Sequence, residues 1–177
     1  LRPGITLCNG RGIHNASTAE LAVGLIIASL RGFPDFVRAQ DRGTWEPASN
    51  RSINDRRIGI VGFGAIGKAI ARNLSGFEVE VLGFSKSGRD GSIRMDKFDS
   101  YLPTLDVVIL ILPLSDESHH LFDAQRLALL KDGALVVNGS RGPIIDTEAL
   151  IVELQSEGIT ADLDCTDTKT LPEVHDS

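Results

Sequence analysis

Three glycines near the middle of the chain have the spacing of a phosphate-binding turn. Gly62, Gly64 and Gly67 form the pattern G-x-G-x-x-G between the apolar run 58–61 and an amphipathic segment that begins at Ala65. In this pattern the glycines permit a tight turn, close approach of a pyrophosphate to the backbone, and close packing of the following helix. The helix N-terminus, with its unpaired N–H groups, then binds anionic oxygens. We therefore expect dinucleotide contacts from Gly62, Gly64, Ala65, Ile66 and Gly67; a turn that serves only packing is the alternative.

The residues after the next apolar run, 79–84, indicate which dinucleotide is bound. An acidic residue about 20 positions after the glycines would accept hydrogen bonds from the ribose hydroxyls. The chain has Ser85 at that place, and Lys86 and Arg89 follow it. A hydroxyl and two cations suit a 2′-phosphate, so we expect NADP(H) to be preferred, with NAD(H) possible. Because Asp90 adds a negative charge nearby, a solvated loop that tolerates either cofactor is the alternative.

Short apolar runs alternate with helical patterns along the chain. The runs that predict buried strands are 5–8, 58–61, 79–84, 107–112, 134–138 and 159–163. The predicted helices are 18–30 opened by Ser17, 65–74, 124–130 after Asp123, and 147–155 after Asp146. Strand and helix in alternation predict an α/β fold, a Rossmann-type doubly wound parallel sheet with helices on both faces.

Composition excludes several classes of protein. The 177 residues carry a formal net charge of −6 and are 42% hydrophobic, which argues against disorder. No basic block is present, so we expect no nucleic-acid partner. The longest uncharged apolar stretch, 21–30, is shorter than the roughly 20 residues that a bilayer requires, so we expect no membrane partner. Cys8 and Cys165 lie far apart, which favours a reducing cytoplasm and offers too few ligands for a metal.

A third motif adds a resemblance to a known family. The segment N-G-S-R-G-P-I-I-D at 138–146 follows a predicted strand, and L-P-L at 112–114 follows the strand before it. With N-G-R-G at 9–12, S-T-A-E at 17–20 and L-D at 163–164, the chain resembles the D-isomer-specific 2-hydroxyacid dehydrogenases over nearly its whole length. The matching part is the NAD(P)-binding domain of glyoxylate or hydroxypyruvate reductases and phosphoglycerate dehydrogenases.

The resemblance implies an activity and a set of residue roles. These enzymes transfer a hydride between NAD(P)H and a small 2-keto or 2-hydroxy acid such as glyoxylate or hydroxypyruvate. Arg141 matches the arginine that holds the substrate, and its planar fork suits two oxygens. Asp164 matches a residue that contacts the nicotinamide carboxamide, and Pro113 one that walls the adenine; Ser140 belongs to the same cofactor set. A surface arginine and a capping aspartate are the alternatives.

The chain also departs from the family pattern. Lys169 stands where the resemblance implies a glutamate that supports a catalytic histidine, and an ammonium there opposes protonation of an imidazole. Asp167 or Glu173 could replace that glutamate, and His175 falls in the loop before the family's Pro-His segment. His14, His119 and His120 are interpreted as loop or helix-start residues. We therefore expect cofactor binding without turnover by these 177 residues alone.

The same resemblance suggests how the chain is divided. Residues 1–16 are expected to be a hinge from a missing substrate domain, 17–164 the dinucleotide-binding domain, and 165–177 the start of a truncated return segment. The main hypothesis is a cofactor-binding domain of a dehydrogenase. A non-catalytic, corepressor-like dinucleotide sensor is the second, and a sugar- or mononucleotide-binding α/β protein with a chance glycine motif is the third.

The segment 31–53 differs from the rest and bears on assembly. Pro34, Gly43 and Pro47 interrupt it around an expected helix at 35–42, so it is predicted to lie at the periphery of the sheet. Trp45 could belong to a subunit contact or to the core. In the family this region pairs two subunits, and we expect a homodimer. The apolar residues that would support it are Leu21, Leu25, Ile26, Leu30, Phe33, Phe36 and Trp45.

Overall fold

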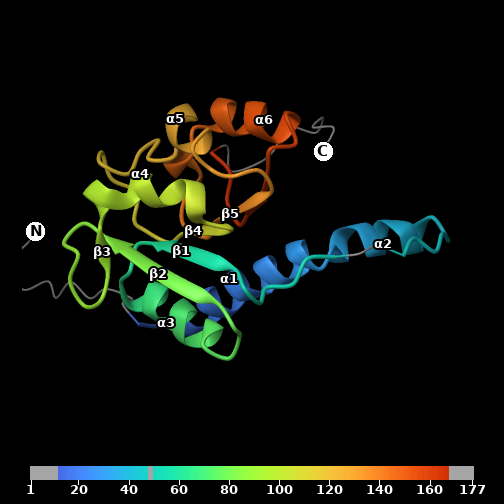
Figure 1. Ribbon diagram of the computed structural model, residues 1–177, viewed down its shortest axis with the longest axis horizontal. Helices are drawn as coiled ribbons and strands as arrows, with labels where there is room; N and C mark the ends of the chain where they lie inside the picture. Colours follow the sequence, from blue (N-terminus) through green and yellow to red (C-terminus); the bar gives the residue numbers. More distant parts are fainter. Residues whose placement is uncertain (1–11, 48–49, 168–177) are drawn as a thin grey trace, which may run out of the picture.

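The computed structural model describes residues 12–47 and 50–167 of the chain, and these contain one parallel sheet (Figure 1). The sheet has the order β3-β2-β1-β4-β5-β6. Its strands are β1 (Arg57–Val61), β2 (Glu80–Ser85), β3 (Ile93–Arg94), β4 (Val107–Leu110), β5 (Ala134–Asn138) and β6 (Ile159–Leu163). The chain builds outward from β1 in one direction and from β4 in the other, which confirms the doubly wound arrangement and places the switch point between β1 and β4.

Helices cover both faces of the sheet, as predicted (Figure 1). The helices α1 (Asn15–Leu30) and α3 (Ala65–Leu74) lie on one face. The other face carries α4 (Phe98–Tyr101), α5 (Ala124–Leu127) and α6 (Thr147–Gln155). Alternation along β4 divides its side chains between two apolar clusters, one beneath each helical layer. Burial on both faces explains why the central strands read as continuous apolar runs.

Two of the predicted helix caps are confirmed and one is wrong. The carboxylate of Asp123 accepts a hydrogen bond from the Arg126 N–H at 3.0 Å. The carboxylate of Asp146 likewise accepts from Ala149 N–H at 3.2 Å. Ser17 does not open a helix, because α1 already begins at Asn15 and the Ser17 hydroxyl donates to the His14 carbonyl at 3.3 Å. The serine thus lies in the first turn and bonds backward within it.

Several predicted boundaries also change. The strand expected at 107–112 ends at Leu110, where its partner β5 ends at Asn138. The helix expected at 124–130 ends at Leu127. The short β3 and α4 were not predicted, since two residues and one turn are too short to show a period. The strand expected at 5–8 lies outside the described residues.

The segment after α1 projects from the body of the molecule (Figure 1). Gly32 has φ +63° and ends α1 so sharply that α2 (Phe33–Asp41) points in a new direction. The predicted peripheral position is therefore confirmed. Trp45 is 92% exposed, so the alternative that it belongs to the core is wrong. Among the described residues no single helix could span a membrane by length and hydropathy, although α1 and α2 together, bent by 63°, would pass that test.

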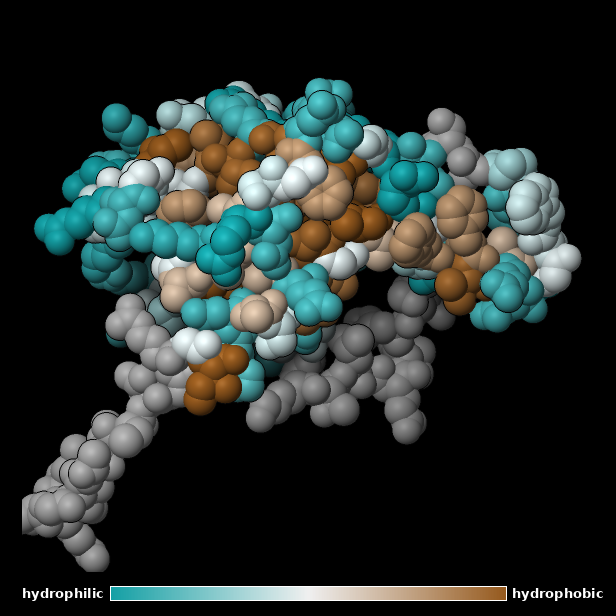
Figure 2. Space-filling model, turned by 90° about the horizontal axis from the view of Figure 1, so that it is seen from below, coloured by the Kyte–Doolittle hydropathy of each residue, from teal (hydrophilic) through white to brown (hydrophobic). Residues whose placement is uncertain are grey.

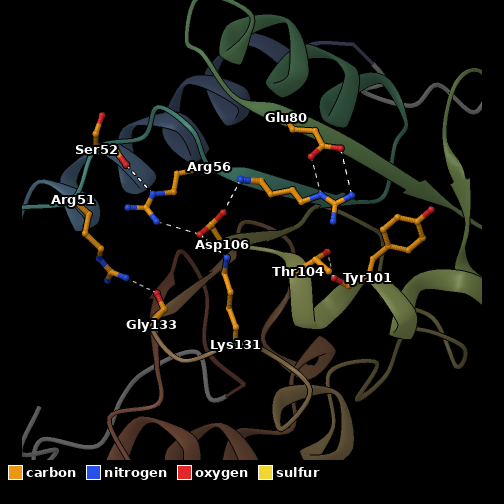
Figure 3. Close-up of polar contacts among 10 residues, drawn as sticks. Arg51, Ser52, Arg56, Glu80, Tyr101, Thr104, Asp106, Lys131 and Gly133 are labelled. Carbon is orange, nitrogen blue, oxygen red and sulfur yellow. Dashed lines mark hydrogen bonds and ion pairs between the residues drawn. The ribbon is translucent and has the colours of Figure 1, made fainter.

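An ion-pair network joins strands at the amino-terminal edge of the sheet (Figure 3). Asp106, which precedes β4, lies 3.2 Å from the Arg56 guanidinium and 2.7 Å from the Lys131 ammonium. Its other carboxylate oxygen accepts a hydrogen bond from the Arg57 N–H at 2.7 Å. Burial by itself would raise the pKa of Asp106, but the hydrogen bonds from Lys131, Arg57 and Arg56 together lower it. The network therefore stabilises the strands at their amino-terminal ends. Ligands of doubly wound sheets bind at the opposite, carboxyl-terminal ends of the strands.

Candidate cofactor site

The glycine turn after β1 has the tight geometry that the sequence predicts. Gly62 has φ +102°, and the N–H groups of Gly62 and Phe63 both donate to the Phe84 carbonyl, at 2.9 and 3.0 Å. A Cβ atom on Gly62 would collide with the backbone of Ile111. A Cβ atom on Gly67 would collide with the Gly62 carbonyl and so push α3 away from β1. Gly62 and Gly67 are therefore required by the backbone itself.

Gly64 has no such structural requirement. Its backbone is extended, with φ −84° and ψ −155°, and a Cβ atom there would meet no atom within 4 Å. Gly64 is the N-cap of α3, and no side chain caps that end. Within the described residues the N–H groups of Ala65, Ile66 and Gly67 have no acceptor. The end of α3 is thus an open set of donors facing empty space, which fits a pyrophosphate.

A cleft opens beside this turn, at the carboxyl ends of β1, β2 and β4. Its volume is about 510 Å³, within the range typical of small-ligand sites. Apolar residues line part of its wall: Val61, Phe84, Met95, Ile111, Leu112 and Leu121. Most of its polar lining residues come from the loop after β2 and the loop after β4. A lining that combines apolar and polar residues suits a nucleoside that carries phosphate.

The loop after β2 is organised by the Ser85 hydroxyl. Ser85 Oγ lies 2.6 Å from Ser92 Oγ and accepts a hydrogen bond from the Gly88 N–H at 3.0 Å. Ser92 Oγ in turn donates to the Arg89 carbonyl at 2.6 Å. Because the Ser92 proton is used there, Ser85 is the donor to Ser92. The hydroxyl of Ser85 thus holds the loop closed, and its predicted contact with a cofactor stays a prediction.

Three of the cations near this loop, Lys86, Lys68 and Arg89, differ in their partners. Lys86 forms an ion pair with Glu117, and Lys68 on α3 forms one with Asp90 at 3.0 Å. Arg89 lines the cleft, and its guanidinium has no hydrogen-bond or ion-pair partner among the described residues. Arg89 is therefore the cation most available to an incoming anion.

The predicted residue Pro113 follows the end of β4, and Ser140 follows the end of the neighbouring strand β5. Pro113 is exposed and lines the cleft. Ser140 is buried, and its hydroxyl donates to the Leu110 carbonyl at 2.6 Å while accepting from the Leu112 N–H at 3.0 Å. Ser140 therefore fixes the chain that leads to Pro113, and a direct contact between Ser140 and a cofactor stays a prediction.

Arg141 and Asp164 lie past the carboxyl ends of β5 and β6, outside the lining of this cleft. Both side chains are exposed. The segment after β6 packs against the turn after Arg141, since a Cβ atom on Gly142 would meet the backbone of Thr166. Burial raises the pKa of the nearby Cys165 thiol, the Asp164 carboxylate raises it further, and the Arg141 cation opposes them. Arg141 thus lies exposed beyond the carboxyl end of β5, and its predicted contact with a substrate stays a prediction.

Comparison with known proteins identifies the family. Residues 23–176 match the family model of the D-isomer specific 2-hydroxyacid dehydrogenase, NAD binding domain. The chain belongs to this family. It is 32% identical to a glyoxylate reductase of Thermofilum pendens over 185 residues, which cover 97% of this chain and 55% of that protein. The chain thus spans about half the length of the curated relatives it matches.

Solved structures of this dehydrogenase family have the same fold. A D-isomer specific 2-hydroxyacid dehydrogenase from Xanthobacter autotrophicus Py2, in complex with NADPH and MES, is 30% identical with a TM-score of 0.82. The alignment covers 93% of this chain and 54% of that one. An NAD-dependent formate dehydrogenase from Staphylococcus aureus, in complex with NAD, is 28% identical with a TM-score of 0.85, covering 93% and 52%. The two relatives hold different nicotinamide cofactors, so similarity alone leaves the choice between them open.

Some residues of the site were not predicted. Glu117 and Ser118 line the cleft from the β4–α5 connection and Arg126 lines it from α5, and no glycine or family motif marks them. On the other side of the glycine turn, His14 and Asn15 at the start of α1 line a second hollow of about 310 Å³. No group of three or more potential metal ligands occurs in residues 12–47 and 50–167. Lys169, Glu173 and His175, together with Cys8, lie outside the described residues.

Proposed function

We propose that this NAD-binding domain belongs to an oxidoreductase that transfers a hydride between NADP(H) and a small 2-keto or 2-hydroxy acid. The observation that carries the proposal is the open N-terminus of α3 at Gly64, beside a cleft in which the Arg89 guanidinium has no partner in the described chain. The turn would bind the pyrophosphate. Arg89, with Lys86 and Ser85, would distinguish a 2′-phosphate from a hydroxyl.

The other site residues receive their roles from position and family membership. Pro113 would wall the adenine, and Asp164 would contact the nicotinamide carboxamide. Arg141 would bind the carboxylate and carbonyl oxygens of the acid with its planar fork. The nicotinamide, when bound, supplies the hydride. Ser140 would act as a positioning residue through its bonds to Leu110 and Leu112.

The cofactor preference is tested by titrating the chain with NADPH and NADH at one ionic strength. We expect NADPH to bind more tightly than NADH. Arg89→Gln should raise the dissociation constant for NADPH by about tenfold and leave the dissociation constant for NADH nearly unchanged. Lys97→Gln is the matched control, because it removes one exposed cation that does not line the cleft. Ser85→Asp should reverse the preference. Equal dissociation constants for the two cofactors in the unmodified chain would refute NADP(H) specificity.

Turnover is tested separately from binding. With glyoxylate or hydroxypyruvate present, we expect the 177 residues alone to bind cofactor without oxidising NADPH. The full-length parent is expected to oxidise it. A parent protein that binds the dinucleotide but reduces no keto acid would instead favour the corepressor-like sensor. Appreciable turnover by the 177 residues would mean that another residue supplies the proton.

The remaining proposals concern the setting of the protein. We propose residues 17–164 as the dinucleotide-binding domain, flanked by a hinge in 1–16 and a return segment in 165–177. We further propose a cytoplasmic homodimer with no nucleic-acid or membrane partner. The support for a dimer is the apolar surface of the α1–α2 region. In Figure 2, which views the face that carries α1 and α3, apolar side chains occur near the centre and again on the projecting arm.

A further inference from the structure

An ion pair joins two loops that line the cleft. The Lys86 ammonium, from the loop after β2, lies 2.6 and 2.7 Å from the two carboxylate oxygens of Glu117, from the loop after β4. Both residues line the cleft. The side chains are 82% and 71% exposed, so the pair is accessible to ions and can open. It therefore connects two walls of the cleft without being part of the core.

The backbone places Glu117 at this position. The neighbouring Ser118 is 4% exposed, and its hydroxyl accepts a hydrogen bond from the Ser115 N–H at 2.7 Å and donates to the Pro113 carbonyl at 2.8 Å. These bonds fold the segment that follows Pro113 into a compact turn. The carboxylate of Glu117 is thus carried by a fixed loop, whereas Lys86 reaches it through a long flexible side chain.

We propose that Glu117 is a specificity-determining residue that competes with the 2′-phosphate of NADP(H) for Lys86. This inference rests on the proposed function, because it assumes that a dinucleotide occupies this cleft. A 2′-phosphate that contacts the Lys86 ammonium competes with the Glu117 carboxylate for it, so the weakening of the ion pair offsets part of the attraction between the ammonium and the phosphate. NAD(H) has ribose hydroxyls there, which can donate hydrogen bonds to a carboxylate. Its binding therefore does not require the ion pair of Lys86 and Glu117 to open. Glu117 therefore moderates the preference that Arg89 creates.

The test is the ratio of NADPH to NADH affinity in a charge-removing variant. We expect Glu117→Gln to tighten NADPH binding by about fivefold and to leave NADH within about twofold of the unmodified chain. The increase should shrink at high salt, which screens exposed charges. Asp116→Asn is the matched control: it removes the neighbouring exposed carboxylate, which lies outside the lining of the cleft, and should change neither affinity.

A second background separates competition from a general loosening of the loop. If Glu117 acts through Lys86, then Glu117→Gln introduced into a Lys86→Gln protein should change NADPH affinity by less than about twofold. An unchanged NADPH to NADH ratio in Glu117→Gln, or equal tightening of both cofactors, overturns the inference while leaving the proposed function intact. Failure of the unmodified chain to bind either dinucleotide overturns the proposed function, and the inference with it.

Discussion

Among the individual residues, Gly64 at the N-cap of α3 and Gly67 in its first turn are glycines for different reasons. Gly67 has no room for a side chain, because a Cβ atom would meet the Gly62 carbonyl. At Gly64 a Cβ atom would meet no atom of the described residues within 4 Å. A glycine that the described part of the fold does not need, at the uncapped end of a helix, is typical of a turn that an anionic ligand approaches closely.

This contrast gives a prediction with an internal control. Gly64→Ala should fold with a free energy of unfolding within about 1 kcal/mol of the unmodified chain, because its extended backbone accepts alanine. It should nevertheless bind dinucleotide about tenfold more weakly, since the methyl group occupies the space of the pyrophosphate. Gly67→Ala should instead lower the free energy of unfolding by about 1–3 kcal/mol. Urea unfolding and dinucleotide titration of both variants measure the two effects. An equal loss of stability in the two variants would contradict the conclusion that the fold requires a glycine at Gly67 and not at Gly64.

For the secondary-structure elements, the network around Asp106 joins β1, β4 and β5 at the amino-terminal edge (Figure 3). The Asp106 side chain is 14% exposed and forms ion pairs with Arg56 and Lys131. Removal of the central carboxylate from this partly buried network leaves several donors without it, so its effect exceeds that of a surface pair. The adjacent pair of Arg57 and Glu80, in which the glutamate side chain is 57% exposed, offers a surface comparison.

We therefore predict that Asp106→Asn lowers the free energy of unfolding by about 1–3 kcal/mol near neutral pH. The native hydrogen bonds lower the pKa of Asp106, so its contribution is complete above the ordinary aspartate range of about 3.9. The contribution is lost as the pH falls through the lowered pKa of the folded state. The difference in the free energy of unfolding between the unmodified chain and Asp106→Asn should accordingly become smaller in strong acid.

Urea unfolding at several pH values measures this dependence. Glu80→Gln serves as the control and should change the free energy of unfolding by less than about 1 kcal/mol. A difference for Asp106→Asn that stays constant down to strong acid would show that the carboxylate charge does not stabilise the strand edge.

For the whole molecule, the α1–α2 region carries apolar surface that the described chain leaves uncovered. Phe33 is 51%, Val37 57% and Trp45 92% exposed. They lie on or beside the arm that projects from the sheet, where no other described element covers them (Figure 1). Exposed aromatic side chains of this size are typical of protein interfaces.

The expected state is a dimer in sedimentation velocity at micromolar concentration. Trp45→Ser should raise the dimer dissociation constant by about tenfold or more, because large aromatic residues contribute most to such contacts. Val152→Ser is the control, since Val152 is 64% exposed on α6, on the opposite face of the sheet. A monomer at all concentrations, or equal effects of the two variants, would argue against an interface at Trp45.

The sequence by itself determined the features that depend on neighbouring residues. The glycine turn, the caps at Asp123 and Asp146, and the apolar runs of the central strands are local patterns. They sufficed to predict the fold and to propose a cofactor site at the glycine turn. It missed β3 and α4, which are too short for a period to appear, and it misplaced the start of α1 at Ser17.

Only the tertiary structure decided how the polar residues of the site are paired. Lys86 and Glu117 lie 31 positions apart, and the Ser140 hydroxyl meets Leu110 across 30 positions. The same holds for Asp106 and Arg56, separated by 50. Parallel strands bring such residues together through crossovers that place distant loops at one edge of the sheet, and no local spacing encodes which loop faces which. For that reason the sequence could only propose Lys86 and Arg89 as cations for a phosphate. The fold determined that Lys86 has a carboxylate partner among the described residues and that the Arg89 side chain does not.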